Sequence, residues 1–392
     1  MRILAFAYAC EPGKGSEPEA GWLWARILAR IGETTVITRE NNRGPIEAAL
    51  PSVPEADRLR FVYVDLPRWA RWWKRGQRGV RLYYLLWQAA AARAGRRLAA
   101  REPFDLVWHL TLANAWLGSL APLVPGRFVY GPVGGGVKVE IRDLRWLGIR
   151  GTAYEVLRSS ARGLGRYLNP AARLAWRRAW LILAQNPETR AWFPARYRDK
   201  VVVQPHAVVE DGAVEPVLPS AARSVRTAVF AGRLLPWKGL ALGLHAMTEA
   251  PGWRLVVFGD GPDARRLRRL AQRLGLQDRV EWRGWRPHGE VSRFLREEAD
   301  VCLHPSLHDD SPFAVAEAMA AGVPVVAVNR GGPKVLLVET GALAPADPRA
   351  LAHALDGELR VAGEARAYPS VDLRLREILE ALALGKSAGH RS

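Results

Sequence analysis

Short apolar runs recur along the chain, and the stretches between them have the character of helices. Strands that alternate with helices predict right-handed crossovers and parallel sheets. In the first half, such runs begin at Arg2, Thr34, Arg60, Asp105, Arg127, Leu181 and Val201. In the second half, they begin at Thr227, Arg254, Val280, Ala299, Pro324 and Gly341. The pattern predicts an α/β protein with two Rossmann-like, doubly wound parallel-sheet domains facing across a cleft.

A segment without clear periodicity separates the two series of strands. Residues 209–224 are rich in acids, Pro and Ser and are expected to form the linker between domains. We therefore expect an N-terminal domain at 1–208 and a second domain at 225–365. A length of 392 residues also fits two domains better than one core.

Composition narrows the class of protein. An apolar content of 49% excludes a disordered chain, and no uncharged apolar run is long enough to predict a transmembrane helix. The start, MRILAFAYACEPG, is more typical of a buried strand than of a signal peptide. Cys10 and Cys302 are too few for a disulfide framework or a thiolate metal site. We expect a cytoplasmic protein.

The formal net charge of +18 is concentrated in two blocks, residues 68–97 and 142–180. In the first block, cations alternate with aromatic residues that include Tyr83, Tyr84 and Trp87. Amphipathic rings beside cations suit an anionic lipid surface, on the inner face of the cell membrane. The predicted membrane-interface residues are Trp69, Arg71, Trp72, Trp73, Lys74 and Arg75. The alternative is a set of solvated helix faces with the aromatic rings in the core, and nucleic acid is not expected as a partner.

The loops that follow the strands carry the candidate chemistry, because ligands of such sheets bind at the carboxyl ends of the strands. After the first strand, Gly13 and Gly15 precede Ser16 and Glu19, which have the spacing of a capping box. A Gly-rich turn that leads into a helix offers backbone N–H groups to an anion. The alternative is a tight turn without a ligand.

The stretch FAGRLLPWKGL follows the first strand of the second domain and places Arg233 and Lys238 beyond its carboxyl end. Two cations at this edge are suited to a diphosphate, since Arg offers a planar fork and Lys a point charge. Ordinary surface basicity is the alternative in so cationic a chain.

The stretch DDSPFAVAEAMAAG places carboxylates beside another strand end. Asp309 and Asp310 follow a strand, Ser311 is the expected helix cap, and Pro312 is expected in the first turn. Glu317 then falls among apolar residues of that helix. An ionised carboxylate there has to be paired or to face a ligand, and a pair of sugar hydroxyls would satisfy its two oxygens.

The order of these motifs resembles the retaining glycosyltransferases of family four, which have the GT-B fold. The stretches that carry the resemblance are GRLLPWKG, VFGDGP, DDSPFAVAEAMAAGVPVVA and NRGGP in the second half, with GSEPEAGWLWARILAR, FDLVWHLT and FVYGPVGGG in the first. The resemblance thus covers most of the chain. It also implies that residues 366–392 form a helix that returns to the N-terminal domain, followed by a loose tail.

The resemblance assigns roles to the acids and cations. Glu317 matches the acid that holds the nucleotide ribose, and Asp309 matches the acid that contacts the hydroxyls of the donor sugar. Arg233 and Lys238 match the diphosphate clamp. The family usually has Glu where this chain has Asp309, and the shorter side chain puts the position or identity of the sugar in doubt.

The resemblance also implies further donor-side positions. Phe313 and Ala314 match helix-start positions whose N–H groups meet the donor, and Gly331 and Gly332 lie in a neighbouring loop. His109 matches a histidine of the first domain that reaches toward the reacting sugar. Pro312 lacks an N–H, so one donor contact of the family is missing here.

We therefore expect a retaining hexosyltransferase that needs neither a metal nor a cofactor. It would move a sugar from a nucleotide-diphosphate donor to a carbohydrate or lipid-linked acceptor in cell-surface glycan synthesis. His304 and His308 are not expected to bind a metal with the neighbouring acids, since Pro305 breaks any helix that would align them. A sugar-nucleotide epimerase and a non-catalytic binding subunit are the alternatives.

Overall fold

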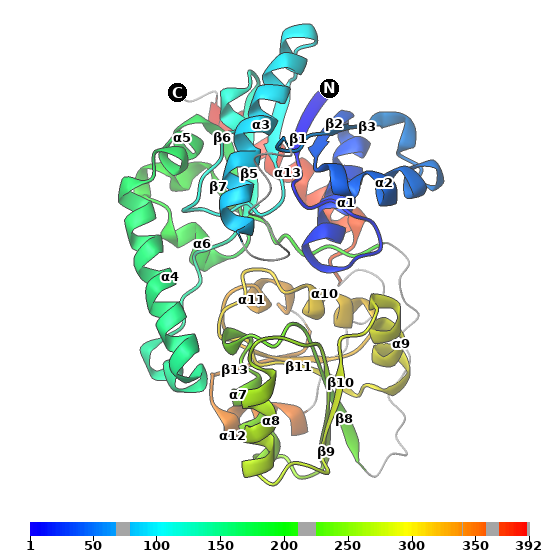
Figure 1. Cartoon of the computed structure of the whole chain (residues 1–392), viewed down its shortest axis with the longest axis vertical. Coiled ribbons are helices and arrows are strands. Elements are labelled where there is room, and N and C mark those ends of the chain that lie inside the picture. The colour runs from blue at the N-terminus through cyan, green and yellow to red at the C-terminus, as the bar shows by residue number, and fades with distance from the viewer. Residues whose placement is uncertain (68–78, 211–224, 339, 358–367, 390–392) are drawn as a thin grey trace. The chain divides into compact units, whose positions relative to one another are not determined.

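A computed structural model of the chain describes residues 1–67, 79–210, 225–338, 340–357 and 368–389. The chain forms two compact units, which are described separately (Figure 1). Unit 1 comprises Met1–Gly136, Arg162–Val208 and Arg374–Ser392, and unit 2 comprises Val137–Ala161 and Val209–Leu373. The predicted linker falls almost wholly on residues 211–224, outside the described residues. Among the described helices, none combines the length and the apolar content needed to cross a membrane.

Unit 1 contains a seven-stranded parallel sheet in the order β3-β2-β1-β4-β5-β6-β7. Its strands are β1 (Arg2–Phe6), β2 (Glu33–Thr38), β3 (Leu59–Tyr63), β4 (Leu106–His109), β5 (Arg127–Val133), β6 (Ala179–Ala184) and β7 (Val201–Val203). Each predicted run of the first half is therefore a strand. The order reverses its direction beside β1, as in doubly wound sheets, whose ligands bind at that edge.

Helices of unit 1 cover the sheet, so its central strands are buried on both faces. They are α1 (Ser16–Ile31), α2 (Arg43–Ala49), α3 (Val80–Arg101), α5 (Pro170–Arg178), α6 (Pro187–Trp192) and most of α13 (Val371–Gly389). Helix α13 continues to Gly389 and thus includes the first residues of the expected loose tail. Helix α4 (Gly148–Leu168) contributes residues to both units.

The aromatic residues of α3 belong to the core of unit 1. Tyr83, Tyr84 and Trp87 are buried, and the rings of Tyr84 and Trp87 each lie 5.2 Å from the ring of Tyr8. The interpretation of these three rings as lipid contacts is wrong. The predicted membrane-interface residues Trp69, Arg71, Trp72, Trp73, Lys74 and Arg75 lie outside the described residues.

Unit 2 contains a six-stranded parallel sheet in the order β10-β9-β8-β11-β12-β13. Its strands are β8 (Arg226–Ala231), β9 (Trp253–Phe258), β10 (Val280–Gly284), β11 (Val301–His304), β12 (Val325–Val328) and β13 (Ala342–Ala344). Its helices are α7 (Leu240–Glu249), α8 (Ala264–Arg273), α9 (His288–Glu298), α10 (Phe313–Ala320), α11 (Pro333–Leu336) and α12 (Pro348–Asp356). All six runs predicted in the second half are strands, and the reversal of strand order lies between β8 and β11.

Two helical glycines of unit 1 differ in the space around them. A Cβ atom on Gly21 of α1 would lie 1.9 Å from the carbonyl oxygen of Ala9, whereas a Cβ on Gly163 of α4 would meet nothing within 4 Å. The missing side chain of Gly21 therefore lets α1 approach the loop after β1.

We predict that Gly21→Ala destabilises the protein, although Ala is the better helix former. Gly163→Ala is the matched control, and it should raise stability by about 0.5–1 kcal/mol through helix propensity alone. Thermal unfolding of both variants measures the difference. A gain in stability for Gly21→Ala would contradict the packing described for α1.

Candidate functional site

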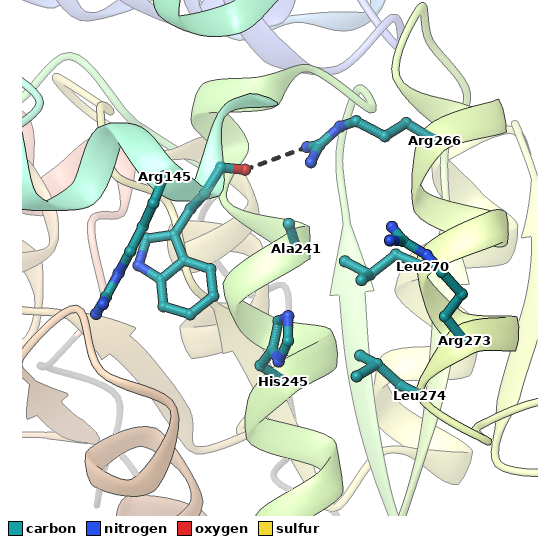
Figure 2. A pocket seen from close by; sticks show the side chains of 8 residues that line it. Arg145, Ala241, His245, Arg266, Leu270, Arg273 and Leu274 are labelled. Carbon is teal, nitrogen blue, oxygen red and sulfur yellow. Dashed lines mark hydrogen bonds between the residues drawn. The ribbon is translucent and has the colours of Figure 1, made fainter. Parts of the chain in front are cut away.

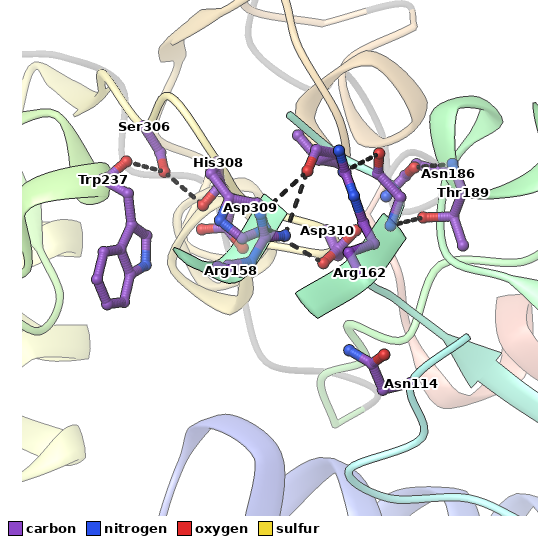
Figure 3. A network of polar contacts seen from close by, with 12 residues as sticks. Asn114, Arg158, Arg162, Asn186, Thr189, Trp237, Ser306, His308, Asp309 and Asp310 are labelled. Carbon is purple, nitrogen blue, oxygen red and sulfur yellow. Dashed lines mark hydrogen bonds and ion pairs between the residues drawn. The ribbon is translucent and has the colours of Figure 1, made fainter. Parts of the chain in front are cut away.

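The loops that follow β8 and β11 are packed together at the carboxyl edge of the unit 2 sheet, because these strands are neighbours. Gly239 has a φ of 72°, and a Cβ there would lie 1.9 Å from the carbonyl oxygen of Pro305. The amide of Leu307 donates to the carbonyl of Trp237 at 2.9 Å. Figure 3 shows the Ser306 hydroxyl between the carbonyls of Trp237 and His308, 3.2 Å from each. The two loops therefore hold one fixed geometry.

This geometry brings Lys238 and Asp309 into contact. Lys238 Nζ donates to Asp309 Oδ2 at 2.5 Å, and His304 Nε2 lies 3.2 Å from the same oxygen. Burial raises the pKa of Asp309, but Lys238 and His304 outweigh it and hold the pKa well below its usual value. Asp309 is thus a carboxylate at neutral pH. Burial also lowers the pKa of His304, against the opposing effect of Asp309, so the imidazole is neutral there.

Glu317 lies on α10, whose other described residues are apolar. Its Oε1 atom lies 3.2 Å from Nε2 of His288, the first residue of α9, and its side chain keeps 17% of its surface exposed. The carboxylate is therefore neither fully buried nor unpaired. It has a partner and retains access to solvent, as expected because an ionised carboxylate among apolar residues is costly without either.

Gly331 and Gly332 hold the backbone of the acidic loop. The amide of Gly332 donates to the carbonyl of Asp309 at 2.9 Å. Gly331 has a φ of 65°, and a Cβ there would lie 2.3 Å from the same carbonyl oxygen. The neighbouring Arg330 is buried and donates to Glu140 Oε1 and Asp143 Oδ2, each at 2.7 Å. The two glycines thus fix Asp309, which is a positioning role.

Arg233, Phe313 and Ala314 lie near the same strand ends. Arg233 follows β8, and within the described residues its exposed side chain makes no hydrogen bond or ion pair. Phe313 begins α10, after Pro312 as its N-cap, and no side chain caps the helix. The prediction of Ser311 as the cap is wrong, because the hydroxyl sits one residue too early. The α10 N-terminus still presents the positive end of a helix dipole.

Several polar contacts of unit 2 were not predicted from the sequence. Arg158 Nη2 lies 2.6 Å from His308 Nε2 (Figure 3). Arg158 Nη1 donates to Glu155 at 3.0 Å. His308 Nε2 also lies 3.7 Å from Asp310 Oδ2. The two histidines near the acids therefore belong to separate pairs. Within the described residues, no three His, Cys, Asp or Glu side chains converge as metal ligands.

Gly13, Gly15 and His109 belong to unit 1. Both glycines have a φ of 71°, and α1 begins at Ser16 with Gly15 as its N-cap. The capping box is altered, because Glu19 accepts from the amide of Gly15 at 3.4 Å while the Ser16 side chain does not cap the helix.

His109 ends β4 and is buried in unit 1 with both ring nitrogens in contact with hydroxyls. Tyr84 Oη lies 2.7 Å from Nε2 and Ser119 Oγ lies 2.6 Å from Nδ1. Burial lowers the pKa of His109 to about 4, so the ring is neutral at pH 7. In this structure the imidazole is a hydrogen-bonding member of the core. Its contact with a reacting sugar stays a prediction.

A partly buried polar contact of unit 1 was also missed. Glu17 accepts from the amide of Leu112 at 2.6 Å, and its other oxygen lies 3.5 Å from His206 Nε2. Burial raises the pKa of Glu17, but His206 and the Leu112 amide outweigh this and lower it. The contact ties the start of α1 to the loop after β4.

Comparison with known proteins gives a family for part of the chain. Residues 221–365 match the family described as glycosyl transferases group 1. The chain is 30% identical over 255 residues to 2-deoxystreptamine N-acetyl-D-glucosaminyltransferase of Streptomyces fradiae. The aligned region covers 60% of this chain and 58% of that protein. It is 36% identical over 140 residues to the putative colanic acid biosynthesis glycosyltransferase WcaL of Escherichia coli (strain K12). That aligned region covers 32% of this chain and 34% of WcaL. The match thus spans less than two thirds of either relative.

A solved structure extends the likeness to the whole fold. The crystal structure of Anabaena HepE in complex with UDP and glucose matches with a TM-score of 0.57 and 17% identity, over 100% of this chain and 99% of that one. The predicted GT-B fold, with its two parallel-sheet domains, is confirmed. The match of residues 221–365 to the group 1 glycosyl transferases confirms the resemblance to a glycosyltransferase family that was found in the sequence.

The buried imidazole of His109 generates a prediction for the pH dependence of stability. An unfolded histidine takes up a proton near pH 6.5, whereas the folded ring does so only near pH 4. Between these values the unfolded chain binds more protons, so acidification favours unfolding. The loss begins below about pH 6.5 and reaches about 3 kcal/mol near pH 4.

Thermal midpoints measured from pH 7.5 to pH 4.5 test this expectation. His109→Gln should flatten the fall of the midpoint with acidification, even if it lowers stability at every pH. His353→Gln, which replaces an exposed histidine of α12, is the matched control and should keep the slope of the wild type. Equal slopes for His109→Gln and the wild type would contradict the buried, neutral ring.

Proposed function

We propose that this chain is a glycosyltransferase that moves a sugar from a nucleotide-diphosphate donor to a carbohydrate or lipid-linked acceptor in cell-surface glycan synthesis. The observation that carries the proposal is the contact of Lys238 with Asp309 beside the N-terminus of α10. It places a cation, an ionised acid and a helix dipole at the carboxyl edge of a doubly wound sheet, where such folds bind nucleotides. The group 1 match over residues 221–365 supports it.

Different residues of the proposed site bind the diphosphate, the sugar and the ribose of the donor. A leaving nucleoside diphosphate gains negative charge, and Lys238, Arg233 and the start of α10 at Phe313 and Ala314 would stabilise that charge. Asp309 is an ionised acceptor for the hydroxyls of the donor sugar. Glu317, with one oxygen near His288, can accept from the ribose hydroxyls. Gly331 and Gly332 serve by holding Asp309 in place.

The finer points are part of the same proposal. Cations and a helix N-terminus supply the charge that a metal would otherwise provide, so we propose transfer without a metal or a further cofactor. We propose retention of the anomeric configuration, with the leaving phosphate taking part in deprotonation of the acceptor. The HepE complex with UDP and the colanic acid role in the name of the E. coli relative support a nucleotide sugar donor and a glycan acceptor.

The acceptor is proposed to lie at a membrane. A lipid-linked acceptor requires the enzyme to work as a peripheral protein at the inner face of the cell membrane. The segment from Trp69 to Arg75 supports this only through its sequence of aromatic and basic residues. Gly13 and Gly15 in unit 1 are proposed to present backbone N–H groups to the donor, and His109 to act on the reacting sugar.

The two neighbouring acids provide the test. Asp309→Asn removes the carboxylate from the sugar hydroxyls and from Lys238, and turnover with a nucleotide sugar should fall by about 100-fold or more. Asp310→Asn is the matched control, since Asp310 lies near His308 and has no role in the proposed contacts. Its turnover should fall by less than about tenfold.

The donor is first found by thermal shift with UDP, GDP and ADP sugars, since a ligand at 100 times its Kd stabilises the protein by about 2.7 kcal/mol. The anomeric configuration of the product, read by NMR, tests retention. Equal turnover for Asp309→Asn and Asp310→Asn would remove Asp309 from the proposed site. Conversion of the donor without any acceptor would favour an epimerase.

A further inference from the structure

Helix α4 has its polar and apolar faces reversed relative to a helix of an ordinary globular domain. In the part that belongs to unit 2, Ile149 is 92% exposed and Leu157 is 69% exposed, with Val156 at 55% between them. The charged Glu155 and Arg158 lie on the inner face, each with about a tenth or less of its side chain exposed. Globular proteins bury one apolar helix stripe and expose the polar one.

The exposed apolar residues form one stripe. Positions 149, 153, 156 and 157 recur at helical spacing, and Ala153 is exposed with the three larger side chains. The small polar residue Ser160 is exposed on the same face. Ile141, which precedes the helix in η6 (Ile141–Trp146), is 87% exposed. The residues of α4 that belong to unit 1 repeat the pattern, with Leu164, Tyr167 and Leu168 exposed. A stripe of this length is larger than the scattered apolar residues of a monomer surface.

Specific contacts fix the orientation of α4 in unit 2. Arg158 donates to Glu155 and to the carbonyl of Val137, and its Nη2 also contacts His308 Nε2. The ring of Tyr154 stacks on that of Trp237 at 4.7 Å, with 15° between the planes. Turning the helix to bury Ile149 and Leu157 would break these contacts of Arg158 and Tyr154. The outward direction of the apolar stripe is therefore built into the unit.

An arginine-rich cavity adjoins this stripe. Ile149 and Arg150 line it together with residues of α8. The basic residues of α8 on this cavity are Arg265, Arg266, Arg268, Arg269 and Arg273. Asp263 is the acid in its lining, and Arg266 already pairs with it at 2.6 Å. Most of the positive charge on this surface is therefore not compensated by its own acids.

The remaining acids near the stripe are likewise engaged by arginines. Asp143 is buried against Arg330, and Glu140 accepts from Arg330 and Arg142. Glu155 pairs with Arg158. Asp260, in the loop before α8, is the exception: it is exposed, and it accepts from the amide of Gly261. The surface around Ile149 thus presents cations outward.

A second cavity, lined by residues of η6, α7 and α8, shares Arg266 and Arg273 with the first and continues the basic surface. The Arg145 guanidinium lies 4.7 Å from the ring of Trp146, and Arg266 donates to the Trp146 carbonyl at 3.2 Å. Figure 2 shows Arg145 and Arg266 among the side chains that line this cavity. Arg273 and His245 also line it. Burial lowers the pKa of His245, and Arg273 and Arg145 lower it further, which reports a positive field in this cavity.

We propose that this surface of unit 2, the α4 stripe at Ile149, Val156 and Leu157 with the α8 arginines, docks on a bilayer that contains anionic phospholipid. The apolar side chains enter the headgroup region and the guanidinium groups bind lipid phosphates. Charge selects this occupant. A second copy of the chain would bring the same arginines together, and a soluble polyanion would leave the isoleucine and leucine side chains in water. The proposal does not depend on glycosyl transfer.

Flotation of the full chain with vesicles tests the surface, using phosphatidylcholine with and without phosphatidylglycerol. The wild type should bind the anionic vesicles and should partition weakly to the neutral ones. Ile149→Ser with Leu157→Ser should lower the partition coefficient on anionic vesicles by about tenfold or more. Val338→Ser with Leu343→Ser, which changes exposed apolar residues elsewhere on unit 2, is the matched control and should bind as the wild type does.

Charge reversal tests the proposed binding of lipid phosphates by the α8 arginines. Arg265→Glu with Arg269→Glu should lower anionic-vesicle binding by about tenfold or more, whereas Arg293→Glu with Arg349→Glu, which makes the same change of net charge, should have a much smaller effect. Thermal shift with the nucleotide sugar is measured on every variant. Lost vesicle binding with an intact donor shift isolates the lipid surface from the donor site and shows that the protein is folded.

Three results would overturn the proposal. The first is equal binding of the wild type to neutral and anionic vesicles, or no binding to either. The second is unchanged binding for the variants of α4 and α8. The third is a dimer of the wild type, seen by sedimentation, that Ile149→Ser with Leu157→Ser dissociates, because a second copy would then cover the stripe.

Discussion

The close contact between the turn at Gly239 and the carbonyl of Pro305 sets the geometry on which the candidate site depends. Only a residue without a Cβ fits there, and the left-handed conformation of Gly239 begins α7 directly behind it. The contact brings the loops after β8 and β11 together, and hydrogen bonds from Leu307 and Ser306 to the Trp237 carbonyl hold them. Lys238 meets Asp309 as a consequence of this backbone packing.

The pairing of Lys238 with Asp309 has an electrostatic consequence for ligand binding. A partly buried carboxylate without a partner is costly, and the ammonium group removes that cost while it keeps Asp309 ionised. In the proposed complex, a donor phosphate would share Lys238 with Asp309, and sugar hydroxyls would replace water at the acid. The backbone contact from Gly332 keeps Asp309 in place during this exchange. Binding would then require little rearrangement within unit 2.

The strands and the site loops were predictable because both have local signals. Apolar runs mark the strands, and loops after neighbouring parallel strands meet at one edge, which is why Lys238 and Asp309 were expected there. Other polar contacts near the site had no such signal. Arg330 and Asp143 are 187 residues apart, and Arg158 and His308 are 150 apart, so only the folded chain brings them together.

In two helices, the spacing of the apolar residues is a better guide to the packing than the composition of the segment. In α3, the spacing of Tyr83, Tyr84 and Trp87 is that of a buried helix face, although the surrounding arginines suggested a lipid contact. In α4, the same spacing of apolar residues marks a face that the protein leaves uncovered. Periodicity shows that residues share a face, and only the contacts of Tyr154 and Arg158 show which face points inward.

The location of a bound nucleotide sugar tests the central claim most directly. A crystal structure of the full chain with the donor that stabilises it should place the diphosphate within hydrogen-bonding distance of Lys238 and of the α10 N-terminus, with sugar hydroxyls on Asp309. A donor bound elsewhere, with the Lys238–Asp309 contact unchanged, would contradict the account.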